Sequence, residues 1–124
     1  MFAKDLGRTL NYLETRTDID STRMAYHGFS WGGALAPVLL AVETGFKAAI
    51  LSSGGFYLRY DLPEVDGLNF APRVNTLVLM LNGQYDDIFP LELSQLPLFR
   101  LLGTPDKDKK HVIYEAGHTD LLPS

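Results

Sequence analysis

The 124-residue sequence predicts one α/β domain, built on a mostly parallel sheet with helices on both faces. Two apolar runs, at 47–53 and 76–83, lack the alternation of a half-exposed strand, which indicates strands covered on both sides. Segments with helical periodicity separate the predicted strands, and strands that alternate with helices are typical of parallel sheets. The sequence shows no internal repeat and no boundary between domains.

The first part of the chain predicts a helix, a strand and a second helix. An amphipathic helix is expected from Phe2 to about Thr17, because apolar residues recur near helical spacing at Phe2, Leu6, Leu10 and Leu13. A short strand over 23–29 ends at a glycine-rich segment. The next helix covers 32–45, and we expect Pro37 to weaken or kink it and Gly45 to end it in a left-handed cap.

The second part predicts the remaining strands and one broken helix. Residues 54–74, between the two apolar strands, are rich in glycine, proline and aromatic residues without a clear period, which indicates a long loop. Residues 90–103 predict a helix that is broken near Pro97. A charged turn over 104–110 then leads into a last strand over 111–117.

Composition excludes several classes of protein. The formal net charge is −4 and the one dense charge run mixes both signs, so we expect no nucleic-acid partner. The absence of cysteine excludes disulfides and thiolate metal sites, and three histidines without ligand spacing argue against a metal centre. No apolar stretch approaches the length of a membrane span, and Asp5 interrupts any signal-peptide pattern. We therefore expect a cytoplasmic protein that does not bind membranes.

Three kinds of residue needed for nucleophilic catalysis follow predicted strands. Ser30 lies in Gly28-Phe29-Ser30-Trp31-Gly32, where small neighbours permit the strained turn that exposes a nucleophile. A serine hydroxyl needs a base to take its proton and a third group to orient that base. Asp86 or Asp87 follows the strand at 76–83, and His118 follows the last strand. The carboxyl ends of parallel strands meet at one edge, so these side chains are expected to converge.

The segments HGFSWGG at 27–33, NFAPRV with TLVLMLNGQYDDIFP within 69–90, and EAGH at 115–118 resemble the α/β-hydrolase superfamily, especially its dienelactone-hydrolase-like and prolyl-oligopeptidase-like esterase branch. In that family the acid follows glycine as Gly-x-x-Asp. Gly83-Gln84-Tyr85-Asp86 matches that pattern, so the resemblance implies Asp86 as the acid, with Asp87 as the alternative.

The resemblance also implies the remaining roles and the reaction. Ser30 resembles the nucleophile, His118 the general base, and the Trp31 backbone N–H one donor to the oxyanion. The implied activity is that of a serine carboxylesterase on a small-molecule ester, without a cofactor. Because the segment 54–74 is short for a lid domain, we expect an open site and a preference for short acyl chains. Phe56 and Tyr57 are candidates for an apolar substrate pocket, although they could equally seal the core.

Two other functions stay open. One is a peptidase of the prolyl-oligopeptidase type, although such enzymes use another domain to grip a peptide terminus and we expect none here. The other is a catalytically inactive, truncated hydrolase that acts as an oligomeric or interaction module.

The resemblance covers only the C-terminal half of the family's fold, so residues 1–124 are expected to form one minimal domain. The family's earlier strands, its His-Gly-Gly type loop with the second oxyanion donor, and its C-terminal helix have no counterpart in the sequence. The strand over 23–29 would then be an exposed sheet edge with unpaired backbone groups. We expect a homodimer that pairs through this edge and whose partner residues complete the oxyanion hole.

Several other polar residues have simpler interpretations. Ser52 and Ser53 are expected to be turn residues, and His27 to have a structural role in the strand before Ser30. His111 is expected to be exposed and inert. The Trp31 ring either packs on a neighbour or contacts substrate.

Overall fold

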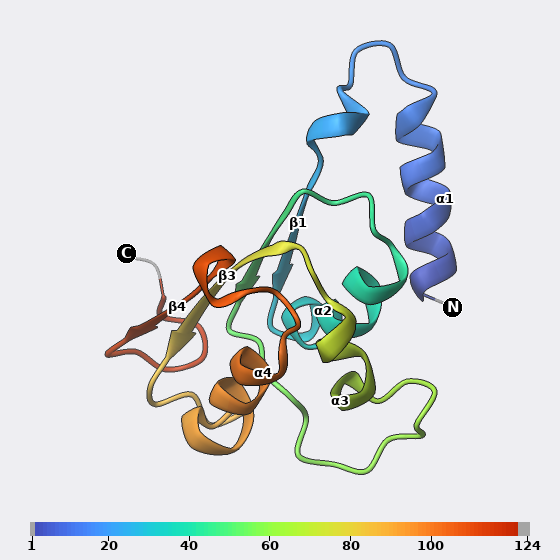
Figure 1. The fold of residues 1–124 in the computed structure, drawn as a ribbon. Helices are drawn as coiled ribbons and strands as arrows, with labels where there is room; N and C mark the ends of the chain where they lie inside the picture. The colour runs from blue at the N-terminus through green and yellow to red at the C-terminus, as the bar shows by residue number, and fades with distance from the viewer. Residues whose placement is uncertain (1, 122–124) are drawn as a thin grey trace.

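The computed structural model describes residues 2–121, and its centre is a sheet of four parallel strands in the order β1-β2-β3-β4 (Figure 1). The strands are β1 (Ala25–Phe29), β2 (Ala48–Ser52), β3 (Leu77–Gly83) and β4 (Lys109–Tyr114). Every pairing is parallel, with Phe29 opposite Ser52 and Ser52 opposite Leu81. The α/β class is confirmed, and all four carboxyl ends lie at the same edge of the sheet.

Helices and short helical turns connect the strands. The α-helices are α1 (Phe2–Glu14), α2 (Trp31–Val42), α3 (Gly67–Phe70) and α4 (Leu96–Leu101). The shorter turns are η1 (Ser21–Arg23), η2 (Ala71–Arg73), the π-helical η3 (Leu91–Gln95) and η4 (Asp106–Asp108). Among residues 2–121, no helix is both long enough and apolar enough to cross a membrane.

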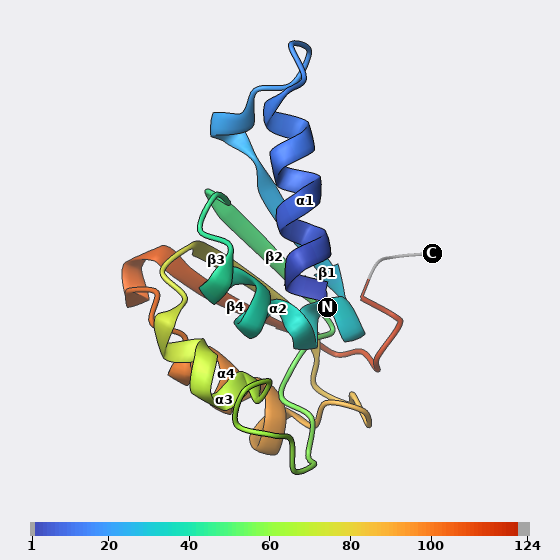
Figure 2. The same cartoon turned by 90° about the vertical axis from the view of Figure 1, so that its right-hand side faces the viewer.

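The helices of the described chain cover one face of the sheet (Figure 2). The strand order follows the sequence, so each right-handed crossover places its helix on the same side. One core results, built from α1, α2, α4 and the inward side chains of β2 and β3, and it includes Leu10, Ala36, Leu40, Ala49, Leu51, Val78, Met80 and Leu98.

The opposite face of the sheet carries apolar side chains without helix cover in residues 2–121. Ile50 of β2 is 39% exposed there, while its neighbours Ala49 and Leu51 are buried. The apolar runs predicted strands covered on both faces. The described chain supplies helices for only one of them.

The end of α2 differs from the expectation. No glycine has a positive φ among the described residues, so Gly45 does not form a left-handed cap. The helix ends at Val42, and the backbone N–H of Glu43, in an extended conformation, donates to the Leu39 carbonyl at 2.8 Å. Pro37 is buried within a helix that continues through it.

The segment predicted as a long loop contains a short ordered stretch before β3. Asp66 precedes α3, and its side chain accepts a hydrogen bond from the Leu68 N–H at 3.0 Å. Such a cap satisfies one of the free N–H groups at a helix start. The helix has only one turn, so it leaves no periodic signal in the sequence. The predicted break near Pro97 corresponds to the change from η3 to α4.

Candidate active site

Ser30 lies on the tight turn that joins β1 to α2. Its φ of 52° and ψ of −109° are unusual for a residue with a side chain, and Ser53 is the only other non-glycine residue with a positive φ in residues 2–121. The Ser30 N–H donates to the Ser52 carbonyl at 2.8 Å, which fixes the turn to the end of β2. Backbone strain of this kind is concentrated at functional sites.

The glycines around Ser30 are required by close packing. A Cβ on Gly28 would collide with the backbone of Gly32, across the turn. A Cβ on Gly33 would lie 2.9 Å from the Cα of Gly54, where α2 approaches the segment after β2. The Tyr26 hydroxyl also donates to the Gly32 carbonyl at 2.6 Å. The turn therefore accepts only small residues at these positions.

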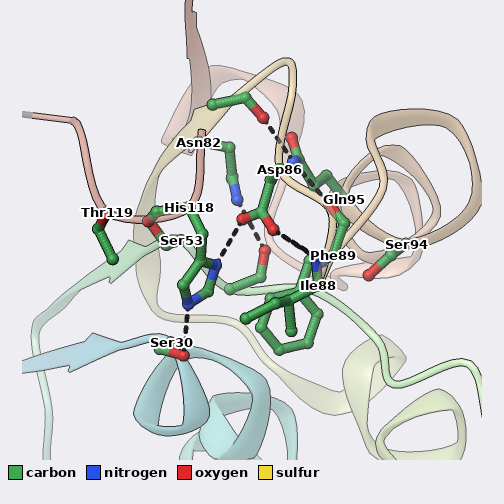
Figure 3. A network of polar contacts seen from close by, with 12 residues as sticks. Ser30, Ser53, Asn82, Asp86, Ile88, Phe89, Ser94, Gln95, His118 and Thr119 are labelled. Atoms are coloured by element: carbon green, nitrogen blue, oxygen red, sulfur yellow. Dashed lines mark hydrogen bonds and ion pairs between the residues drawn. The ribbon is translucent and has the colours of Figure 1, made fainter. Parts of the chain in front are cut away.

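The side chains of Ser30, His118 and Asp86 form a hydrogen-bonded series (Figure 3). His118 Nδ1 lies 2.8 Å from Asp86 Oδ2, and His118 Nε2 lies 2.7 Å from Ser30 Oγ. A carboxylate can only accept, so Nδ1 carries the proton and Nε2 accepts from the serine hydroxyl. The His118 side chain is 11% exposed and that of Asp86 is fully buried, so water has little access to the pair.

The structure brings Asp86 to the histidine, and Asp87 stays apart. The second oxygen of Asp86, Oδ1, accepts from the N–H groups of Ile88 and Phe89, each at 2.9 Å. These bonds hold the carboxylate in position and give its second oxygen two hydrogen-bond donors. Asp87 is exposed, and its side chain makes no hydrogen bond within the described part of the chain.

Ser53, expected to be a simple turn residue, is fully buried beneath the histidine loop. Its hydroxyl donates to the His118 carbonyl at 2.6 Å, and its own N–H donates to the Leu81 carbonyl at 2.8 Å. Its φ is 49°, a conformation that a serine adopts only where its surroundings impose it. Nothing in the sequence indicates this contact, because the two residues are 65 positions apart.

Gln95 holds the segment that carries Asp86. Its side-chain amide donates to the carbonyls of Gly83 and Phe89, at 2.9 and 2.7 Å, so it joins the two ends of that segment. Gln95 is fully buried, and its Oε1 has no hydrogen-bond partner among the residues that the structure describes. Sequence reasoning missed this residue because a glutamine in a helical stretch is ordinarily a surface residue.

The expectation that His111 is exposed is wrong. The ring is half-buried, and burial lowers the pKa of His111 below its usual value. Its Nε2 lies 3.0 Å from Asn82 Oδ1, and the Asn82 amide donates to the Gly54 carbonyl at 2.8 Å. His27 lies on β1 with its Nε2 3.1 Å from Ser52 Oγ, a contact with the next strand.

The start of α2 lies directly beside Ser30. Trp31 is the first residue of the helix, so its N–H has no acceptor within the helix and lies at the positive end of the helix dipole. The Trp31 ring is 51% exposed and packs edge-on against Phe2, with ring centroids 5.0 Å apart. It also lines a cavity of about 480 Å³.

Phe56 and Tyr57 line the same cavity from the segment after β2. Phe56 is buried and belongs to the core cluster, so it seals the core as well as lining the cavity. Tyr57 is half-buried, and its ring packs on Phe89 at 5.1 Å between centroids. Phe89 in turn packs on the His118 ring at 5.8 Å. An aromatic chain therefore connects the cavity wall to the histidine.

Known proteins similar to this chain are hydrolases and proteins of unassigned function. Two uncharacterized proteins of Mycobacterium tuberculosis, from strains CDC 1551 and H37Rv, are 30% identical over 133 residues, which cover 95% of this chain and 46% of theirs. The chain therefore spans about half the length of the curated relatives it matches.

Solved structures share the fold. A putative dienelactone hydrolase from Klebsiella pneumoniae is similar with a TM-score of 0.78 and 24% identity, over 95% of this chain and 49% of that one. Dipeptidyl peptidase 4 from Porphyromonas gingivalis matches with a TM-score of 0.79 and 18% identity, over 94% of this chain and 19% of that one. Acetyl xylan esterase 1 from Thermoanaerobacterium matches with a TM-score of 0.74 and 18% identity, over 94% of this chain and 46% of that one.

The family model of the dienelactone hydrolases matches residues 2–119, which include Ser30, Asp86 and His118. Its match runs through every strand of the sheet, from the helix before β1 to the loop after β4. The chain therefore belongs to the dienelactone hydrolase family.

Proposed function

We propose that this chain is a serine carboxylesterase that cleaves small esters with short acyl chains through an acyl-enzyme. The observation that carries the proposal is the hydrogen-bonded series of Ser30, His118 and Asp86 at the carboxyl edge of the sheet. Nucleophile, base and orienting group lie within hydrogen-bond reach of one another, as the chemistry requires. Membership of the hydrolase family supports the same reaction class.

In the proposed mechanism Ser30 Oγ attacks the ester carbonyl while His118 Nε2 takes the serine proton. Asp86 holds the ring in the required tautomer and stabilises the imidazolium that forms. The tetrahedral oxyanion accepts a hydrogen bond from the Trp31 N–H. The C–O bond to the alcohol then breaks, and His118 returns the proton to the leaving oxygen. Water, deprotonated by His118, hydrolyses the acyl-enzyme and frees Ser30 and the acid.

A further part of this proposal is a homodimer. The unpaired edge of β1 favours it, and so does the need for a second oxyanion donor beside the Trp31 N–H. Among residues 2–121, β1 pairs only with β2, so its outer edge presents free backbone groups. A second copy that pairs edge to edge around a two-fold axis covers this edge and brings partner residues toward Ser30. Native mass spectrometry is expected to record a dimer at micromolar concentration, and a monomer would contradict the pairing.

The test of the activity is intact-mass spectrometry after incubation with a fluorophosphonate. The expected result is a single adduct on the wild type and none on Ser30→Ala. Asp87→Asn serves as the matched control for Asp86→Asn, because only Asp86 touches His118. The proposal fails if a folded wild-type sample takes no adduct, or if Ser30→Ala is labelled equally.

The open edge of β1 favours one second candidate, an inactive interaction module in which the hydrolase residues are inherited architecture. A dimer without any fluorophosphonate adduct would support this alternative over the esterase.

A further inference from the structure

A groove runs along one side of α2 and begins beside the candidate nucleophile. It belongs to the cavity of about 480 Å³, and we call it the α2 groove. Trp31, Leu35, Val38 and Val42 form its floor, at intervals of three or four residues that align on one side of the helix. Phe56 and Leu68 lie on its opposite wall. From Trp31 to Val42 the helix extends roughly 16 Å at 1.5 Å per residue.

Two residues of the lining connect this groove to the candidate site, although Ser30 and His118 do not line it themselves. Trp31 directly follows Ser30, and its backbone N–H is the proposed oxyanion donor. Tyr57, also part of the lining, reaches His118 through the ring of Phe89. The groove therefore begins one residue from the nucleophile, where a group of the substrate that extends away from Ser30 can meet apolar side chains.

Charged residues border the groove on the side of the 57–68 segment, and they are mostly acidic. One guanidinium, Arg59, and three carboxylates, Asp61, Glu64 and Asp66, line it. Arg59 Nε donates to Asp61 Oδ1 at 3.0 Å, and its guanidinium lies 4.6 Å from the centre of the Tyr57 ring. The single cation is thus already paired, and the border is left with net negative charge.

We propose that the α2 groove binds the apolar alcohol side of a neutral or cationic ester, because the acyl side of the proposed substrate is short. Apolar lining favours an alkyl or aryl group, because its burial removes apolar surface from water. Acidic neighbours repel a carboxylate, which would also lose hydration in the groove. This inference rests on the proposed esterase function for its role in catalysis, and on the groove alone for binding.

Binding can be measured without catalysis, because Trp31 is the only tryptophan in the chain and lines the groove. The probes are 1-octanol, octylammonium and octanoate, which share chain length and differ in charge, at pH 7 and low salt. Octanol and octylammonium are expected to shift the Trp31 emission saturably, with octanoate at least about tenfold weaker. Equal binding of octanoate and octanol, or no saturable shift with any probe, would overturn the proposal.

Two pairs of variants locate the binding. Ala34→Phe fills the groove from α2 and is expected to abolish the octanol response, whereas Leu93→Phe, at an exposed residue of η3 outside the lining, leaves it unchanged. Glu64→Lys is expected to raise octanoate affinity several-fold, whereas Glu92→Lys, an exposed residue outside the lining, does not. An octanol response that survives Ala34→Phe in a folded protein would place the probe elsewhere.

Ester kinetics then separate the two sides of the substrate. In an active enzyme, kcat/KM is expected to rise by up to about fourfold per methylene along acetates of longer alcohols and not along methyl esters of longer acids. A flat response to the longer alcohols overturns the catalytic role of the groove. If the protein hydrolyses nothing, the proposed function fails, while the Trp31 titrations still decide whether the groove binds.

Discussion

Two substitutions of Ser53, to alanine and to glycine, remove its hydroxyl. Together they distinguish an effect on the stability of the fold from an effect on the position of His118. Both lose the hydrogen bond to the His118 carbonyl, which contributes about 1 kcal/mol, and leave a carbonyl that is costly to bury unpaired. Ser53→Gly also relaxes a backbone at φ 49°, which relieves roughly 1–2 kcal/mol of strain. Ser53→Ala keeps that strain.

The two variants are therefore expected to differ in stability and to agree in function. The free energy of unfolding in urea is expected to fall by about 1–3 kcal/mol for Ser53→Ala and by roughly 0–1 kcal/mol for Ser53→Gly. In both, the histidine loop loses its attachment to the end of β2. The fluorophosphonate labelling rate is therefore expected to fall by about tenfold or more in both, because a misplaced base loses alignment with Ser30.

A spectroscopic signal tests the position of the histidine without any turnover. The proton on His118 Nδ1, shared with Asp86, gives a downfield proton resonance in NMR when the hydrogen bond excludes water. This resonance is expected to broaden or disappear in Ser53→Gly at a temperature where the variant is fully folded. A stable Ser53→Gly protein that retains the resonance and the wild-type labelling rate would refute the reasoning.

Three further predictions concern other contacts of the site and core. Gly33→Ala places a Cβ 2.9 Å from the backbone of Gly54 and is expected to lower the free energy of unfolding in urea by about 1–3 kcal/mol. Gly45→Ala places its Cβ in open space, so its free energy of unfolding is expected to be unchanged or slightly higher. Gln95→Leu removes the side-chain donor of the Phe89 carbonyl and leaves the Gly83 carbonyl with the 3.3 Å bond from the Asp86 N–H. The free energy of unfolding is therefore expected to fall by about 1–3 kcal/mol, with slower labelling, and unchanged labelling in a folded variant would count against the role of Gln95. Burial lowers the pKa of His111, so the unfolded state binds its proton more readily and stability is lost as the pH falls below about 6.5. His111→Asn is expected to reduce that loss between pH 7 and 5, and an identical pH profile would contradict it.

The sequence was most informative where a residue's local surroundings decide its role. Ser30 is bracketed by glycines, and Gly28 is needed because the turn brings it against the backbone of Gly32 only four residues later. Asp86 and His118 each follow a strand, and parallel strands necessarily bring their carboxyl ends to one edge. The α/β class and the neighbourhood of these three side chains could therefore be predicted.

Long-range contacts were not predictable in the same way. Ser53 and His118 meet across the sheet, and nothing near either residue encodes the other. Gln95 holds the segment that carries Asp86, and it lies at the end of a π-helical turn. Residue propensities do not predict a π-helical turn. The choice between Asp86 and Asp87 depended on which side chain turns inward, and the two N–H groups of Ile88 and Phe89 decide that only in the folded chain.

The strand order has a consequence for when the site can function. Because β1, β2, β3 and β4 are laid side by side in the order of the sequence, the sheet can grow from one edge as the chain is synthesised. The serine is in the first strand's turn, and its base is 88 residues later. The turn that carries Ser30 can therefore form before His118 is in place, and Ser30 stays unreactive until the loop with His118 docks. Labelling of Ser30 would then report the completion of folding rather than its onset.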